Sequence, residues 1–319
     1  MQILVRPIVW LLLLAAPIAG AQEYPAKAIR IVVPYAAGGG TDTVARLMAA
    51  KVAASFGQPV VVENKPGASA NIGAEFVARA PADGYTVLVT APNFTTSEAL
   101  FEKLPWKFED FAPVIHLVRY ANVLVASPQS QISSTEQLIA RAKGAAAPLN
   151  YGTPGTASNT HLAMELLKQR TGINIQHVPY KGSGPLKTDL LGGHIGLAAD
   201  GLGGQMELIR TGKVKAIAVL GPRRSPLAPE LPSLGDAGLA DVDGTGWYGA
   251  LVPAATPAAV VARLHAAFAA ALQSADVRER LTVIGVEPVG GTSEEFRNYL
   301  LGERRKWAAV IRAAQVKAD

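Results

Sequence analysis

The chain has 319 residues, of which 49% are hydrophobic and 17% charged, and it contains no cysteine. This composition excludes a disordered chain and a small disulfide-stabilised scaffold, and the length suits two compact units or one large α/β domain. The 30 basic and 25 acidic residues are scattered, so the net charge of +5 forms no basic run and nucleic acid is not an expected partner. The lack of cysteine also excludes thiolate catalysis and thiolate metal ligands.

The first residues have the form of a secretion signal. Arg6 supplies a positive charge, residues 8–16 are apolar, and Ala19-Gly20-Ala21 fits a signal peptidase site. The alternative is a membrane anchor, but the apolar run is shorter than the ~20 residues that a spanning helix needs, and Pro17 interrupts it. We therefore expect residues 1–21 to be a signal peptide cleaved after Ala21, leaving an exported, soluble protein with no stable membrane insertion.

The first half of the remaining chain alternates predicted strands and helices. β-branched runs predict strands at residues 29–34, 60–63 and 85–90, and amphipathic patterns predict helices at 41–56 and 71–80. This alternation is typical of a parallel sheet with helical crossovers. Thr41 is expected to cap the first helix, and Gly57 suits the left-handed position just after its end.

A second alternating series follows. It predicts strands at residues 123–126, 149–152, 175–179, 195–199 and 214–220, and helices at 134–142, 158–170, 186–191 and 205–211. Four prolines then precede an apolar run at 247–252 and three helices at 257–272, 275–283 and 293–314. Because these late helices have no strand set of their own, we expect them to return to the first sheet. The prediction is a discontinuous lobe 1 of residues 22–123 and 232–319, with an inserted lobe 2 of residues 124–231.

The most informative segment is a glycine loop between a strand and a helix. Gly38, Gly39 and Gly40 follow the first strand and open the first helix. First-turn N–H groups have no partner inside a helix and carry partial positive charge, so this turn can hold a carboxylate or phosphate without a charged side chain. The spacing does not match the G-x-G-x-x-G dinucleotide fingerprint. The alternative is that the glycines only make the turn, with Thr41 and Asp42 capping it.

A similar strand-to-helix turn occurs in the second series. Residues 150–161 lead from a strand through small hydroxyl side chains into a helix. Ligands in open α/β sheets bind at the carboxyl ends of parallel strands, so two such turns facing each other across a cleft can clamp an anion. The alternative is two independent loops on opposite surfaces.

Motifs for catalysis are missing from the sequence. The Gly182 to Thr188 segment lacks the glycine that precedes the lysine of a phosphate loop, and no G-x-S-x-G occurs. The five histidines show no zinc-binding spacing. We therefore expect no enzyme activity, no cofactor and no metal. Asp200 follows a predicted strand and either meets a ligand or caps the next helix, and Lys181 can donate to an anion or lie on the surface.

Taken together and in order, several segments resemble the Bug family of extracytoplasmic solute receptors, the substrate-binding components of tripartite tricarboxylate transporters. These segments are Tyr24-Pro25 with residues 29–42, residues 57–64 with Gly67-Ala68, and residues 82–86, 111–114, 151–162, 178–182, 190–193 and 246–249. The resemblance implies a two-lobed α/β fold of the type II periplasmic-binding-protein or Venus-flytrap kind, with a parallel-rich sheet in each lobe. It also implies a periplasmic monomer that closes over a small carboxylate and delivers it to membrane permease subunits.

In the family, loops equivalent to residues 35–42 and 152–158 grip the ligand, often through ordered water. Asp200 falls where the family often carries an aspartate, and the glycines after it are expected to reshape the pocket of lobe 2. The residues expected to bind the ligand are Tyr35, Gly38, Gly39, Gly40, Thr41, Asp42, Asn93, Gly152, Thr153, Thr156, Ala157, Ser158, Lys181 and Asp200. The alternatives are a periplasmic sensor for a two-component system and an exported α/β hydrolase.

Overall fold

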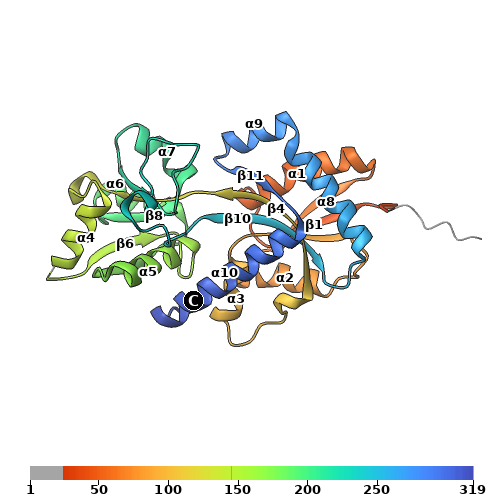
Figure 1. Ribbon diagram of the computed structural model, residues 1–319, viewed down its shortest axis with the longest axis horizontal. Coiled ribbons are helices and arrows are strands. Elements are labelled where there is room, and N and C mark those ends of the chain that lie inside the picture. The colour runs from red at the N-terminus through yellow and green to blue at the C-terminus, as the bar shows by residue number, and fades with distance from the viewer. Residues whose placement is uncertain (1–23, 145, 319) are drawn as a thin grey trace, which may run out of the picture.

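A computed structural model describes residues 24–144 and 146–318. The expected signal peptide and its cleavage after Ala21 lie outside the described residues. The described chain forms two α/β lobes, each built on one sheet (Figure 1). This arrangement confirms the predicted two-lobed α/β architecture.

Lobe 1 contains a six-stranded mixed sheet in the order β11-β4-β10-β3-β1-β2. Its strands are β1 (Ile29–Val33), β2 (Val60–Asn64), β3 (Thr86–Thr90), β4 (Phe111–Tyr120), β10 (Gly246–Pro253) and β11 (Glu287–Gly290). The pairs of β1 with β2 and β3 are parallel, whereas β10 runs antiparallel to both β3 and β4. The parallel pairs bring the carboxyl ends of β1 and β3 to one edge of the sheet, where ligands bind in such folds.

Helices cover both faces of the lobe 1 sheet. One face packs on α1 (Gly40–Phe56), α8 (Ala258–Gln273) and α9 (Ala275–Val283), and the other on α2 (Asn71–Ala78), α3 (Asn93–Leu100) and the first half of α10 (Ser293–Ala314). Successive side chains of β1 point to opposite faces of the sheet. Ile31 and Val33 pack in the core under α1, α8 and α9, and Val32 packs in the core under α2, α3 and α10. Burial on both faces explains why the last three residues of this strand are all apolar.

Lobe 2 contains a five-stranded mixed sheet in the order β7-β6-β8-β5-β9. Its elements are β5 (Asn122–Ala126), α4 (Thr135–Gly144), β6 (Leu149–Thr153), α5 (Asn159–Thr171), β7 (Ile175–Pro179), α6 (Ser183–Gly192), β8 (Leu197–Gly201), α7 (Leu202–Arg210) and β9 (Lys215–Val219). β6 pairs in parallel with β7 and β8, and β5 runs antiparallel to β8 and β9. The carboxyl ends of β6 and β8 therefore share an edge, as those of β1 and β3 do in lobe 1.

Two chain crossings join the lobes. β4 ends in lobe 1 at Tyr120 and β5 begins in lobe 2 at Asn122, while the chain returns from β9 to β10 (Figure 1). The side chain of Asn122 donates to the carbonyl of Gly244 at 2.7 Å, so the two crossings are hydrogen-bonded to each other. This pairing places a compact connection between the lobes.

Helix α10 contributes to both lobes, whereas the sequence placed it on the first sheet alone. Phe296 and Leu300 pack in lobe 1, but Trp307, Val310 and Ile311 belong to the core of lobe 2. Figure 1 shows the helix running from lobe 1 towards α5. A helix this long reaches across, because 22 residues at 1.5 Å each cover roughly 33 Å. The lobe boundaries at residues 123/124 and 231/232 stay a proposal.

Three elements were missed from the sequence, namely α3, β4 and β11. α3 is short and rich in threonine, Pro113 interrupts the strand pattern of β4, and β11 contains Pro288 and has four residues that are all partly or fully exposed. Helix α1 also differs from expectation at its start. Its N-cap is Gly39 rather than Thr41, and Gly57 has the expected left-handed conformation.

Within residues 24–144 and 146–318, no single helix has the length and apolarity needed to cross a membrane. Only α8 and α9 taken together meet that test, across a 71° bend.

Candidate ligand cleft between the lobes

A cavity of about 370 Å³ lies between the lobes. Lobe 1 and the crossings supply Tyr35, Thr41, Ala91, Pro92, Asn93, Tyr120, Asn122 and Tyr248, and lobe 2 supplies Pro154, Thr156, Ser158, Asn159, Thr160, Asp200 and Gly201. The amino ends of four helices, α1 and α3 from lobe 1 and α5 and α7 from lobe 2, therefore line one cavity. Among these described lining residues there is no Lys or Arg, and Asp200 is the one acidic side chain.

The glycine loop of lobe 1 is fixed by Asp42. Its Oδ2 accepts from the Gly38 backbone N–H and from Arg46 Nε, both at 2.9 Å, and its Oδ1 accepts from Asn64 at 2.9 Å. Burial acts to raise the pKa of Asp42, but these hydrogen bonds outweigh it and lower the pKa to about 2. Asp42 is buried and already has partners on both oxygens. Its role is thus to hold the loop rather than to face the cavity.

Three tyrosines form the aromatic wall of the cavity. Tyr120 and Tyr248 have ring centroids 5.0 Å apart, and Tyr35 lies in the same lining. Burial raises the pKa of Tyr248 to about 12, although the hydroxyls of Thr41 and Tyr120 act to lower it, and burial also raises the pKa values of Tyr35 and Tyr120. The phenols therefore stay protonated near neutral pH and can donate hydrogen bonds.

Gly40 is needed for the position of Tyr248. A Cβ added at Gly40 would lie 2.5 Å from the Tyr248 hydroxyl oxygen, which is closer than real Cβ contacts allow. Glycine thus permits the first turn of α1 and the Tyr248 hydroxyl to meet at the cavity wall.

The loop of lobe 2 is fixed from behind by buried polar side chains. Ser158 caps α5 by accepting from the His161 N–H at 3.2 Å, and His161 Nδ1 accepts from the Ala157 N–H at 3.0 Å. Ala157 has a left-handed conformation with φ of 56°, which is unusual for a residue with a side chain. Thr153 Oγ1 lies 2.7 Å from His177 Nε2 and donates to the Gly155 carbonyl. These contacts orient the amino end of α5.

The starts of α1 and α5, one in each lobe, keep open donors. The first-turn N–H groups of Thr41, Asn159 and Thr160 have no hydrogen-bond partner within the described chain. At α3 the Phe94 and Thr95 N–H groups donate to nearby carbonyls, which leaves that of Asn93 open. At α7 the N–H groups of Gly201 and Leu202 are used, which leaves those of Gly203 and Gly204 open. The cavity therefore has open backbone donors on both sides.

The structure brings together six of the residues expected to bind a ligand, and they are Tyr35, Thr41, Asn93, Thr156, Ser158 and Asp200. The other eight, outside the cavity lining, are Gly38, Gly39, Gly40, Asp42, Gly152, Thr153, Ala157 and Lys181. Gly152 is buried where a Cβ would lie 2.4 Å from Leu186, so its smallness serves packing. Thr153 and Ala157 support the loop from behind, and Lys181 is exposed.

Other lining residues escaped the sequence-based set of ligand contacts. Tyr120 and Asn122 lie on the crossing, and Tyr248 lies on β10, far from either loop in sequence. Only the crossing geometry brings them to the cavity. Asn159 and Thr160 had a signal, since they directly follow Ser158 at the start of the predicted helix 158–170.

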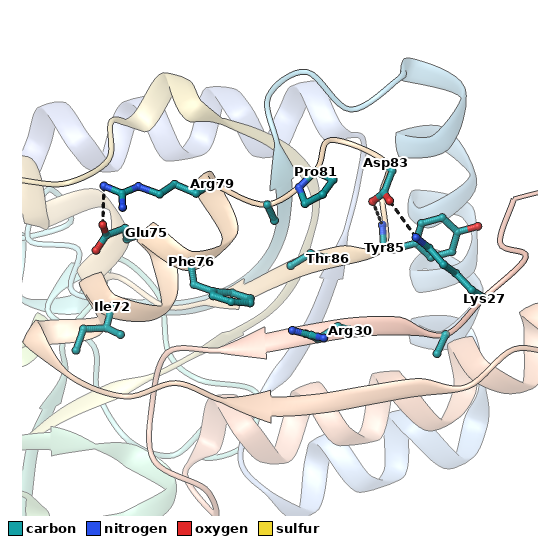
Figure 2. A pocket seen from close by; sticks show the side chains of 12 residues that line it. Lys27, Arg30, Ile72, Glu75, Phe76, Arg79, Pro81, Asp83, Tyr85 and Thr86 are labelled. Carbon is teal, nitrogen blue, oxygen red and sulfur yellow. Dashed lines mark hydrogen bonds and ion pairs between the residues drawn. The ribbon is translucent and has the colours of Figure 1, made fainter.

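A larger hollow of about 750 Å³ lies elsewhere, on the surface of lobe 1 (Figure 2). Its charged side chains are already paired, Arg79 with Glu75, Lys27 with Asp83, and Arg30 with Glu63. All its lining residues come from one lobe, and the start of neither α1 nor α5 reaches it. The interlobe cavity is therefore the better candidate for the ligand site.

Two lobes joined by paired crossings, with a cavity between them lined from both sides, define a solute-binding protein of the periplasmic binding-protein fold. The chain belongs to the tripartite tricarboxylate transporter family receptors, and the sequence model of this family matches residues 44–316.

Similar proteins agree with this assignment. Protein BugT of Bordetella pertussis is 34% identical over 307 residues, covering 95% of this chain and 94% of BugT. The solved structure of R. palustris Rpa4515 with adipate is 34% identical with a TM-score of 0.79, covering 92% of this chain and 99% of that chain. MatC (Rpa3494) from Rhodopseudomonas palustris with bound malate is 32% identical with a TM-score of 0.75, covering 90% and 100%.

Proposed function

We propose that this receptor captures a small carboxylate, with a dicarboxylate as the best fit, between the amino ends of α1 and α5. The observation that carries the proposal is the pair of helix starts with open N–H groups on opposite walls of one cavity whose described lining contains no Lys or Arg. Neutral donors suit an anion here, because they add the partial positive charge of two helix dipoles at little desolvation cost. The ligands of the two R. palustris relatives, adipate and malate, have carboxylates at both ends.

The strength of such a site is adequate for a transport receptor. Each helix terminus contributes on the order of 1 kcal/mol, and each hydrogen bond to a charged group about 1.5–3 kcal/mol. Four such bonds with two helix ends therefore reach about −8 kcal/mol, which is micromolar affinity. The tyrosine wall adds apolar contact for the carbon chain of the ligand.

Closure of the lobes would bring the two anion sites onto one ligand. The open donors lie on different lobes, and among the described residues the chain passes between the lobes at the β4–β5 and β9–β10 crossings, with α10 packing on both. A ligand that contacts both walls stabilises the closed arrangement more than the open one, which is how it shifts the population. The closed face would then dock on the permease subunits of a tripartite transporter.

We further propose that the chain is exported with cleavage after Ala21, that it acts as a monomer in the periplasm, and that it binds its solute without chemical change. The signal-like composition of residues 1–21 supports export, and membership of a transporter receptor family supports delivery to a permease. A two-component sensor role has no comparable support.

The direct test is calorimetric titration of the mature protein with monocarboxylates, dicarboxylates, tricarboxylates and neutral sugars. We expect at least one carboxylate to bind with micromolar affinity and to raise the melting temperature as its concentration increases. Binding of sugars with no response to any carboxylate would refute the proposal.

A further inference from the structure

Asp200 places an acidic side chain in the cavity that we propose to bind an anion. It lines the same cavity as the open N–H groups of α1 and α5, and it is only 4% exposed. A ligand carboxylate placed against it would meet a like charge in a poorly solvated site, which is unfavourable. The part of the ligand that faces Asp200 must therefore be something other than a carboxylate.

Three hydrogen bonds hold the carboxylate of Asp200 in place. Oδ1 accepts from the Ser183 hydroxyl and from the Gly201 N–H, and Oδ2 accepts from Gln205 Nε2, each at 2.8 Å. Ser183 and Gly201 stand at the starts of α6 and α7, so two helix dipoles also favour the negative charge. Asp200 is thus a fixed negative charge in the wall of lobe 2.

Gln205 shows how strongly the site is arranged around this charge. Its amide turns the NH₂ group towards Asp200, and its own Oε1 is left buried without a hydrogen-bond partner in the described chain. A buried orphan acceptor costs stability, so holding the carboxylate is the dominant interaction.

The carboxylate keeps room for one more donor. Two carboxylate oxygens accept about four hydrogen bonds, and Asp200 receives three from protein. The open acceptor position is on Oδ2. An O–H or N–H group of a ligand satisfies it, whereas a methylene group leaves it unsatisfied.

We propose that Asp200 selects dicarboxylates that carry a hydroxyl or ammonium group on the carbon chain over those with plain methylene groups. This inference rests on the proposed function and names its substrate class. In the bound state the ligand carboxylates meet the helix starts of α1 and α5, and the donor group between them faces Asp200.

The test compares succinate, malate and aspartate, which share a four-carbon dicarboxylate skeleton and carry no donor, a hydroxyl and an ammonium group respectively. Titrations of the full mature protein should give malate or aspartate a Kd at least about tenfold below that of succinate, as expected for a hydrogen bond to a charged group. Which of the two binds more tightly identifies the donor. Succinate binding as tightly as both would overturn the inference.

The variant Asp200→Asn should abolish this preference. It is tolerated by the fold because the Gln205 amide can rotate, so that its orphan Oε1 accepts from the new NH₂ group. The matched control is Asp189→Asn, which removes one negative charge from the same lobe outside the cavity, where the side chain accepts from Tyr180. The control should keep the wild-type preference.

The outcomes separate two failures. If Asp200→Asn weakens all three ligands by the same factor, Asp200 only caps α7 and the inference is wrong while the proposed function stands. If neither wild type nor variant binds any carboxylate, the proposed function itself fails and takes the inference with it.

Discussion

The side chain of Asp42 shows how a single residue can shape a binding site without touching it. It ties the Gly38 N–H, Arg46 and Asn64 together and so fixes the loop that presents α1 to the cavity. Gly40 then allows the close approach of Tyr248 to the same turn. Both residues were predicted to contact the ligand, and neither is among the residues that line the cavity.

The lowered pKa of Asp42 predicts an acid-sensitive contribution to stability. Its pKa falls from 3.8 to about 2, so the stabilisation is present above pH 3.8 and is lost as the pH falls towards 2. Asp42→Asn should therefore lower the unfolding free energy by ~1–2 kcal/mol at pH 7 and remove this part of the acid dependence. Urea unfolding at pH 7, 5 and 3 measures it. The exposed Glu207→Gln is the control, and equal losses in both variants would contradict the role of Asp42.

Gly40→Ala should weaken ligand binding by displacing Tyr248. The new methyl group would lie 2.5 Å from the Tyr248 hydroxyl oxygen, and the loss of one donor to a carboxylate predicts about tenfold lower affinity. The matched control is Gly39→Ala, whose Cβ meets only the Ala36 carbonyl oxygen at 3.5 Å and whose φ of −73° suits any residue. Titration of both variants with the same ligand compares them. Equal affinities would show that Tyr248 does not contribute.

At the scale of single elements, the decisive feature is the start of α5. Ser158 caps the helix with φ of −60° and ψ of 157°, and Asn159 is the first helical residue, with its N–H open to the cavity. Proline is well tolerated at this first position, and the extended conformation of Ser158 suits a residue that precedes proline. The element thus offers a way to delete one backbone donor and leave the helix intact.

Asn159→Pro should reduce carboxylate affinity by about tenfold or more, because it removes one N–H donor to a charged ligand. Asn159→Ala is the control, since it keeps the N–H and loses the 3.4 Å contact of the side chain with the Thr245 carbonyl. Calorimetry gives the affinities and circular dichroism checks the helix. If alanine and proline have the same effect, the side chain rather than the backbone binds the ligand.

At the scale of the whole molecule, the crossing strands divide the space between the lobes into two parts. The ligand cavity lies beside β1, β3, β6 and β8. A second cavity of about 310 Å³ lies on the other side, beside β11 and β9, and Tyr120 lines both. If the crossings act as a hinge between them, we expect one cavity to open as the other closes.

This hinge arrangement predicts that a larger side chain in the second cavity, called the rear cavity here, favours closure of the lobes around the ligand. Val289 lines the rear cavity from β11 and is 42% exposed, so Val289→Trp adds volume there without contact with the ligand cavity. The Kd for the ligand should decrease several-fold, and small-angle scattering of the unliganded variant should show a smaller radius of gyration. Val289→Ala should leave both unchanged. A higher Kd for the tryptophan variant would contradict the hinge.

Many of the strands and helices are determined by their own local sequence. The strands β1 and β7 and the helices α9 and α10 were predicted almost to the residue, because the β-branched residues of the strands and the amphipathic periods of the helices specify them without help from distant residues. The same holds for the glycine loop and for the start of α5, which was predicted at Ser158 and begins at Asn159. The two lobes followed from the order of these elements.

The cavity wall, in contrast, was decided by tertiary structure. The wall includes Tyr120, Asn122 and Tyr248 only because β4 crosses between the sheets beside β10. A local sequence pattern does not predict a contact between residues more than 100 positions apart. The same reason explains why α10 packs in both lobes. The sequence by itself specified two helix starts after strands, and only the packing of the two sheets decided that those of α1 and α5 line one cavity.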